Sequence, residues 1–452
     1  MTTSTRPRPG PPREYHFPRF ERHVLHNGLN VIVAPVRKLP VVSVAAVVDA
    51  GVLRDPEGLE GLAELTALSL REGTTLRDGL KLALDLEMLG TSVEAGAGWD
   101  NAIASMTVLT DRLVPAFEIF AEVLLSPAFR EDDIVRLKAE RLAERMQVMA
   151  EPRGLADESF DRFVYAADSR YAEPMSGTTG SISRITRENV AEFYRDNHVP
   201  GATTLIIVGD VSVSEGRKLA ESAFGGWSGR KTELNREADK PARSDRSVRI
   251  ISRPDAAQSE LRIGHPGIPR SHPEYFNVTV MNAVLGGLFS SRINLNLREK
   301  HGYTYGASSY YDWRRQAGPF VISTAVQSEV TGEAIAETLR EIKRMQTEEI
   351  GPEELTLATS YLEGVFPIRY ETTGSIASAL AILETYRLPE NYYDTYRAMI
   401  AGVTTTDVLQ AARRFIEAEK LQVLVVGNPE LVRAPVEALG IGPVSVSEPV
   451  DP

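Results

Sequence analysis

The sequence of 452 residues contains no cysteine. Disulfide bonds, thiolate metal sites and cysteine nucleophiles are therefore excluded. No run of about 18 apolar residues occurs, so the sequence predicts no membrane span. The formal net charge of −12 argues against a nucleic acid or an anionic membrane as partner. These absences leave a globular protein whose chemistry must come from other side chains.

Histidine is scarce, and its positions exclude one kind of site. The chain has seven histidines, and none lies between residues 27 and 197. The body of the first half therefore offers no imidazole to a metal ion. His265, His272 and His301 are spaced unlike two ligands on one helix, and we interpret them as structural or surface residues. The sequence also contains neither a Gly-x-Ser-x-Gly nucleophile elbow nor a Gly-Lys-Ser/Thr phosphate loop.

Length and composition predict more than one domain. A chain of 452 residues is too long for a single core, while 42% hydrophobic and 25% charged residues are ordinary values for a globular protein. Residues 1–13 are rich in Pro, Arg and Thr and contain no apolar segment of a secretory signal. We expect residues 1–19 to be a disordered tail. A cytoplasmic location is expected, or a periplasmic one if an export segment is missing.

The first half reads as strands alternating with helices. We expect strands at 29–34, 41–48 and 202–209, and a hairpin over 92–109 around Trp99-Asp100-Asn101. Helical patterns cover the ranges 57–70, 80–89, 114–125 and 132–149, the last ending before Pro152.

A polar stretch without periodicity, residues 226–246, predicts a linker. After it the pattern returns: Leu205-Ile-Ile-Val-Gly-Asp210 resembles Val423-Leu-Val-Val-Gly-Asn428. We therefore expect an α+β fold of two homologous domains related by a pseudo-twofold axis, each with a mixed, mainly antiparallel sheet and helices on one side. The predicted domains are 20–225 and 247–440, and 441–452 is a second tail.

The stretch from Asn282 to Tyr311 holds the candidate site. Pro273 opens a helix that is interrupted at Gly286-Gly287, and a second short helix runs to Arg298 and stops before Gly302. From Tyr303 the residues alternate as in a strand, and its tyrosines suggest a strand face or a surface for substrate peptide.

Arg298 and Tyr305 stand at the end of that helix and the start of that strand. A guanidinium and a phenol side by side are donors suited to a substrate carbonyl or the oxyanion formed from it. The alternative from residue types alone is structural: Arg298 complements a helix C-terminus, and Tyr305 is an ordinary strand residue.

The same stretch resembles a known family. Gly286-Gly-Leu-Phe-Ser-Ser-Arg292 followed by Leu297-Arg-Glu-Lys-His-Gly-Tyr-Thr-Tyr-Gly306 is similar to the C-terminal domain of the pitrilysin family of inverzincin zinc peptidases. The resemblance extends over nearly the whole chain. It implies that Arg298 and Tyr305, seven positions apart, bind the substrate backbone beside a zinc site, with Gly286, Gly287 and Phe289 near the substrate.

In the family, the first domain carries zinc on a helix reading Gly-Leu-Ala-His-x-x-Glu-His. Here the matching segment is Gly61-Leu-Ala-Glu64-Leu-Thr-Ala67-Leu68-Ser-Leu-Arg-Glu-Gly-Thr74. Glu64 and Leu68 stand at the histidine positions and Ala67 at the position of the general base. Glu144 stands at the third ligand's position, with Glu140 as a fallback. The resemblance thus implies no metal and no cofactor in this chain.

The resemblance implies a function in two-subunit members of the family. This chain would be the subunit without zinc in a heterodimeric metallopeptidase, inactive alone, and its homologous partner would hold the zinc. Arg298 and Tyr305 would bind peptide substrate and stabilise the transition state at the partner's site. The alternative is a non-catalytic peptide-binding or scaffold protein of the same fold. An unorthodox peptidase is disfavoured, because neither a base nor metal ligands are visible.

Overall fold

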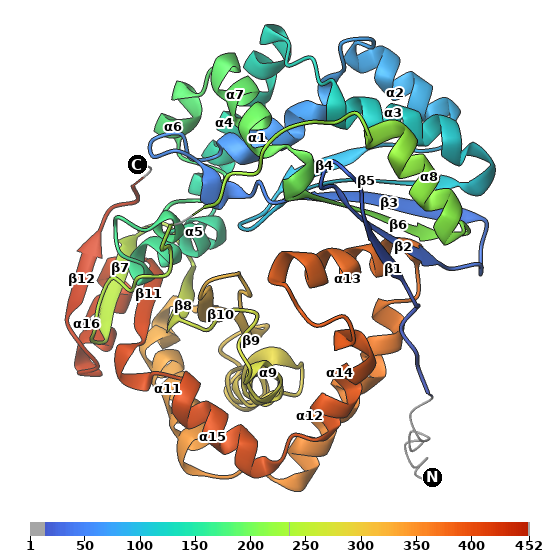
Figure 1. Ribbon diagram of the computed structural model, residues 1–452. Coiled ribbons are helices and arrows are strands. Elements are labelled where there is room, and N and C mark those ends of the chain that lie inside the picture. Colours follow the sequence, from blue (N-terminus) through green and yellow to red (C-terminus); the bar gives the residue numbers. More distant parts are fainter. Residues whose placement is uncertain (1–13, 235, 451–452) are drawn as a thin grey trace, which may run out of the picture.

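The computed structural model describes residues 14–234 and 236–450. They form two six-stranded sheets, the first at the upper right and the second at the lower left of Figure 1. The first sheet has the order β1-β2-β6-β3-β5-β4: β1 Glu21–Val24, β2 Asn30–Pro35, β3 Val41–Val48, β4 Glu94–Ala97, β5 Ala102–Leu109 and β6 Thr203–Gly209. The second has the order β12-β7-β11-β8-β10-β9: β7 Ser247–Ser252, β8 Gln258–Pro266, β9 Ala307–Tyr311, β10 Pro319–Gln327, β11 Gln422–Gly427 and β12 Val444–Ser447.

The two sheets repeat one topology. In each, a parallel pair (β2–β6, β7–β11) is followed by antiparallel strands out to a hairpin at the edge. Only the opposite edge differs, since β1 comes from the start of the chain and β12 from its end. The fold is the predicted α+β duplication with mixed, mainly antiparallel sheets.

The helices also correspond. The first half has α1 Leu62–Ser69, α2 Gly79–Met88, α3 Leu113–Leu125, α4 Glu131–Ala150, α5 Pro152–Val164, α6 Thr179–Arg184, α7 Arg187–Asn197 and α8 Val213–Phe224. The second half has α9 Tyr275–Asn282, α10 Arg292–Asn294, α11 Thr331–Thr347, α12 Pro352–Arg369, α13 Thr373–Tyr386, α14 Tyr392–Ala401, α15 Thr405–Phe415 and α16 Pro429–Ala438. Two π-helical turns, η6 Ala283–Gly287 and η7 Leu295–Lys300, flank α10.

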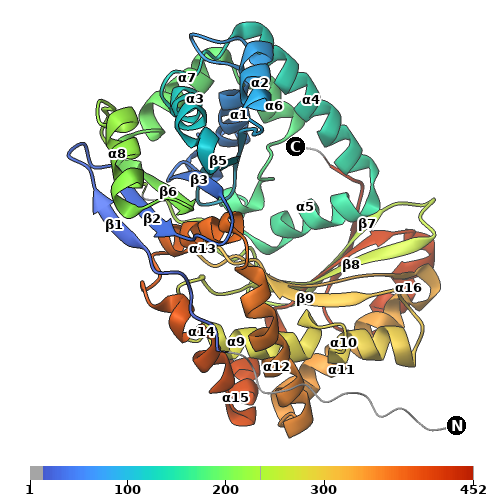
Figure 2. The same ribbon diagram turned by 90° about the vertical axis from the view of Figure 1, so that its right-hand side faces the viewer.

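Each half lends one helix to the other. Helix α5 packs on β11 and β8 of the second sheet, and α13 packs on β3 and β6 of the first (Figures 1 and 2). Phe160 and Phe163 of α5 share a buried cluster with strand residues Val321 and Leu424. The central strand β6 is buried along its whole length, because helices cover both of its faces. Separating the two halves would therefore expose the face of the second sheet that α5 covers and the face of the first sheet that α13 covers.

Several elements differ from the sequence-based expectations. Helix α5 was not predicted; Pro152 is its first residue, where the missing N–H has no helical acceptor to lose. Strand β1 was not predicted either. Within the expected terminal tails, Phe17 is buried against Tyr393 with ring centroids 4.5 Å apart, and residues 444–447 form β12. The remainder of the first tail, residues 1–13, lies outside the described residues.

Among residues 14–234 and 236–450, no helix is both long enough and apolar enough to cross a lipid bilayer.

Candidate functional site

A buried ion pair holds the start of α1, the helix that matches the family's metal helix. Arg170 Nη2 lies 2.9 Å from Asp55 Oδ2, and the two side chains are 1% and 0% exposed. Asp55 also accepts hydrogen bonds from the backbone N–H groups of Gly61 and Ala63, at 2.8 and 2.7 Å. The carboxylate thus caps the first turn of α1, whose own N-cap residue, Gly61, has no side chain to do so.

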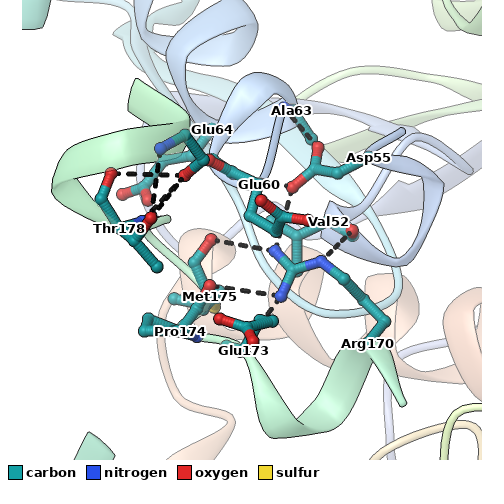
Figure 3. Close-up of polar contacts among 12 residues, drawn as sticks. Val52, Asp55, Glu60, Ala63, Glu64, Arg170, Glu173, Pro174, Met175 and Thr178 are labelled. Carbon is teal, nitrogen blue, oxygen red and sulfur yellow. Dashed lines mark hydrogen bonds and ion pairs between the residues drawn. The ribbon is translucent and has the colours of Figure 1, made fainter. Parts of the chain in front are cut away.

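The same arginine fixes the loop that faces α1. Arg170 donates to the carbonyl oxygens of Val52, Glu173 and Pro174, at 3.2, 3.0 and 3.1 Å (Figure 3). Gly61 has φ +95°, and a Cβ there would lie 2.5 Å from the Ser176 carbonyl oxygen. Only glycine allows this close approach. Gly61 and Arg170 therefore fix the position of the loop that packs against the start of α1.

Where the family's metal ligands would be, the structure places an arginine between two carboxylates. Arg141 of α4 lies 3.1 Å from Glu64 of α1 and 2.6 Å from Glu144. Leu68 packs against the apolar core instead of facing a ligand. Burial raises the pKa of Glu64, and the charge of Glu144 adds to that rise while Arg141 opposes it. A guanidinium therefore supplies the positive charge at this point.

These residues do not fit a zinc ion. Zinc in proteins takes about three or four nitrogen, sulfur or carboxylate ligands, and here two carboxylates are already bound by Arg141. Within 14–234 and 236–450, no group of three or more His, Cys, Asp or Glu side chains is arranged to hold a metal. This is compatible with a chain that carries no zinc of its own.

Next to Glu64 a cavity of about 350 Å³ opens between the two halves. Trp99, Phe160 and Tyr310 line it together with charged side chains from both halves. Its carboxylates are Glu64, Asp157, Glu158, Asp161 and Asp312, and its guanidiniums are Arg141, Arg262 and Arg314. A pocket shared by the two halves thus lies beside α1, the helix without metal ligands.

In the second half, Arg298 lies in the π-helical turn η7. Its guanidinium carbon is 4.6 Å from the ring centroid of Phe289, and its Nε is 3.4 Å from the Glu299 carboxylate. The Phe289 side chain is itself 69% exposed. Arg298 is therefore held at the surface by a cation–π contact, with hydrogen-bond donors left for a ligand.

Tyr305 lies two residues before β9, so the prediction that the strand starts at Tyr303 is wrong. Asn294 and Leu297 explain why: the Asn294 side chain accepts from Ala307 N–H at 3.0 Å, and the Leu297 carbonyl accepts from Tyr303 N–H at 2.9 Å. Between these anchors the Tyr305 side chain projects outward and is 92% exposed. In the described part of the chain, no hydrogen bond or ion pair joins it to Arg298.

The other residues of the predicted site take different places. Gly286 is buried, and a Cβ there would lie 2.5 Å from the Ser309 backbone nitrogen, so its role is to let η6 approach β9. Gly287 is exposed. The structure thus brings Arg298 and Phe289 together and places Gly287 and Tyr305 at the surface, while Gly286 supports the turn.

Sequence reasoning missed Arg141 and the charges around the cavity. Arg141 stands three residues before Glu144, a spacing that puts both on one helix face and is common in exposed charged helices. Asp157 and Asp161 lie on the unpredicted α5, and Asp312 and Arg314 lie in the other half. Their meeting depends on the exchanged helix, which no local pattern reports.

Comparison with known proteins identifies the relatives of this chain. The profile "Insulinase (Peptidase family M16)" matches residues 31–173, and "Peptidase M16 inactive domain" matches residues 184–362. A protein of Rickettsia bellii named an uncharacterized zinc protease is 24% identical over 90% of this chain and 98% of its own length. A protein of the same description from Streptomyces coelicolor is 22% identical over 88% of each chain.

Solved structures agree with the fold. The crystal structure of a peptidase M16 inactive domain from Pseudomonas fluorescens has a TM-score of 0.85 and 26% identity, covering 91% of this chain and 98% of that one. A protease from Helicobacter pylori has a TM-score of 0.81 with 18% identity, over 91% and 100% of the two chains. The two profile matches together span most of the sequence, and the chain therefore belongs to peptidase family M16, the pitrilysin or insulinase family.

Proposed function

We propose that this chain is the non-zinc-binding subunit of a heterodimeric zinc metallopeptidase. It supplies Arg298 and Tyr305 to bind peptide substrate and to stabilise the transition state at the zinc site of a homologous partner. The observation that carries the proposal is that the residues at the metal-ligand positions are already bound, whereas Arg298 and Tyr305 are available to bind a ligand. Arg141 occupies both Glu64 and Glu144, whereas Tyr305 is 92% exposed and Arg298 keeps free donors.

The surroundings of the pair support a binding role. Phe289, Leu295 and Tyr305 are 69%, 44% and 92% exposed within seventeen residues of sequence. Single exposed apolar side chains are common, but several in one short segment, one of them stacked on a guanidinium, favour a contact surface. The π-helical turn η7, Leu295–Lys300, lies in this stretch, and η6, Ala283–Gly287, lies just before it; such turns often occur at functional sites.

The chemistry assigned to this chain is donation of hydrogen bonds. The planar fork of Arg298 suits backbone carbonyl oxygens of an extended peptide, and the Tyr305 hydroxyl suits the oxygen that becomes negative during attack. Donors already in place at that oxygen stabilise it without reorganisation. The partner would contribute the metal and the general base: among residues 14–234 and 236–450 no group of side chains is arranged to hold a metal, and Ala67 stands at the position of the base.

The test begins with purification of the chain with its partner from the source cells. A partner bearing His-x-x-Glu-His is expected, and peptide hydrolysis requires both chains. Tyr305→Phe is expected to lower kcat of the complex by roughly 10²-fold, the effect of removing one oxyanion donor. Tyr361→Phe, on the half-exposed face of α12, is the matched control and leaves kcat unchanged. An unchanged rate in Tyr305→Phe would remove the assigned role.

A second candidate is a non-catalytic peptide-binding or scaffold protein. The observation in its favour is that Arg298 contacts Phe289 and not Tyr305 in the described structure. In that case the chain would be recovered alone, as a homo-oligomer, or with partners that lack the zinc motif. We also propose that the protein of the first proposal, the non-zinc-binding subunit, is cytoplasmic. Fractionation of the source cells tests this location.

A further inference from the structure

We infer that helix α2 is a contact surface through which two copies of this chain associate about a two-fold axis. The helix, Gly79–Met88, lies near the top of the molecule in Figures 1 and 2, away from β9 and from Tyr305, which lies two residues before that strand. The inference therefore concerns a surface of the first half only and does not depend on the proposed function.

Helix α2 carries apolar residues on two opposite faces. Leu82 and Leu86, one helical turn apart, are 2% and 4% exposed and pack into the core of the first half. Leu80, Leu84 and Met88 follow the same spacing on the other side of the helix, and they are 73%, 49% and 84% exposed. A surface helix needs one apolar stripe, because only one of its faces meets the core. The outer row (Leu80, Leu84 and Met88) thus has no part in that core.

The outer row continues beyond the helix. Leu76, in the bend before α2, lies four residues before Leu80 and is 77% exposed. Single exposed apolar side chains are common, but a row of large ones is typical of a surface that binds another protein. The charged residues between Leu80 and Met88 are Lys81, Asp85 and Glu87, with a sum of −1, which argues against an anionic membrane as the occupant.

The charges on one flank of the outer row fit a second copy in antiparallel orientation. Lys81 and Asp85 lie one turn apart on the same flank, and they form an ion pair within the chain. When a two-fold axis relates two antiparallel helices, each flank faces the same flank of the other copy in reverse order. Lys81 of each copy then lies beside Asp85 of the other, so the surface is complementary to itself.

Asp85 can accept this additional contact. Its Oδ1 accepts from Lys81, and its Oδ2 accepts from Arg77 Nε at 2.8 Å. A carboxylate has about four lone-pair positions, so two remain for the lysine of a second copy. Lys81 is 60% exposed and is therefore accessible to the other chain.

The other flank limits the strength of the association. It carries Ala83, which is small enough to let two helices approach, and the exposed Glu87, which would face Glu87 of the second copy. This repulsion and the small area of a contact between single helices predict a weak, reversible dimer instead of an obligate one.

The first test is sedimentation velocity of the purified full-length chain. Its mass is expected to rise toward that of two chains as the concentration increases from about 1 to 100 μM, the range in which weak interfaces form. Leu84→Glu puts a charge at the centre of the outer row and is expected to weaken the association at least about a hundredfold. Leu357→Glu, on α12 and 51% exposed, is the matched control and leaves the association unchanged.

A charge reversal tests the orientation of the two helices. Lys81→Glu would place like charges side by side in an antiparallel pair and is expected to weaken the dimer at least about tenfold. An unchanged affinity in Lys81→Glu would overturn the antiparallel arrangement.

The absence of cysteine from the sequence permits a second, independent measurement. In Leu84→Cys the two thiols of a dimer would lie close to the two-fold axis, so a short bis-maleimide reagent is expected to join two chains. Leu357→Cys is the control and is expected to stay a single chain under the same conditions. This measurement also holds if Leu84→Glu fails to fold.

A chain that stays monomeric over the whole concentration range would overturn the inference, including the case in which the outer row binds a different protein. So would a dimer that Leu84→Glu leaves unchanged, or equal cross-linking of the two cysteine variants. None of these measurements involves peptide hydrolysis or a zinc-binding partner, so failure of the proposed function would leave their outcome unaffected.

Discussion

The two halves of the molecule have one topology but use their charged residues in opposite ways. The first half has two ion pairs at α1, Asp55 with Arg170 and Glu64 with Arg141, and their side chains are mostly buried. In the second half, Tyr305 is almost fully exposed and Arg298 rests on an exposed ring. At the start of the first half the charged side chains around α1 pair with one another inside the protein, while at η7 the residues proposed to bind substrate leave their donors at the surface.

The largest effect on stability is expected from removing the buried Asp55–Arg170 ion pair of the first half. Arg170→Met leaves Asp55 buried without its counter-charge, and the expected loss of unfolding free energy is about 3–5 kcal/mol. Urea denaturation followed by circular dichroism measures it. As a control, Arg195→Met removes an arginine that is 65% exposed and is expected to cost less than about 0.5 kcal/mol. Equal losses of unfolding free energy in the two variants would show that the buried Asp55–Arg170 pair stabilises the fold no more than a surface arginine does.

A second test makes the first half more like the second at one position. Helices α7 and α15 each begin with a threonine capping box, and they are followed at equivalent places by His198 and Ile416. Both are buried, and neither ring nitrogen of His198 has a hydrogen-bond partner in the described structure. Burial lowers the pKa of His198 to about 4.

The sign of the resulting pH dependence follows from that lowered pKa. Between about pH 6.5 and pH 4 the unfolded chain binds a proton that the folded chain does not, so stability falls as the pH falls. His198→Ile is expected to remove about 3 kcal/mol of the loss between pH 7 and pH 4. Urea denaturation at a series of pH values measures the difference. Parallel profiles for the two proteins would contradict the assignment.

The smallest effect is expected in the second half. Arg298→Ala is expected to change the unfolding free energy by less than about 0.5 kcal/mol, because its contacts are at the surface. Thermal unfolding of the purified variant measures this. A loss above about 2 kcal/mol would make Arg298 a structural residue and weaken its assignment to substrate binding.

The sequence predicted five of the six strands and four of the eight helices of the first half, because their signals are local. The apolar run Val41–Val48, the hairpin around Trp99 and the charged helix α4 can each be recognised from neighbouring residues. The loss of the metal ligands was also visible, since Glu64, Leu68 and the absent histidines are facts of the sequence. The boundaries of the two domains and the linker at 226–246 stay predictions.

The remainder depends on contacts between distant residues. Asp157 and Arg262 meet only because α5 crosses to the second sheet, and Glu64 meets Arg141 only because α1 packs on α4. Tyr305 was expected inside a strand because its neighbours alternate, but anchors at Asn294 and Leu297 hold it in a loop. At Tyr305, strand propensity was overruled by these two hydrogen bonds, while the two ion pairs join distant residues that no local pattern connects.

The exchange of α5 and α13 also bears on how such a chain arose. A single ancestral half, folded alone, would leave one face of its sheet without the helix that covers it. Two copies could satisfy each other only by trading these helices, as domain-swapped dimers do. Fusion of two genes would then have made a permanent chain out of an obligate pair. The segment that joins the two halves would have arisen with that fusion, whereas the contacts that α5 and α13 make with the opposite halves would be older.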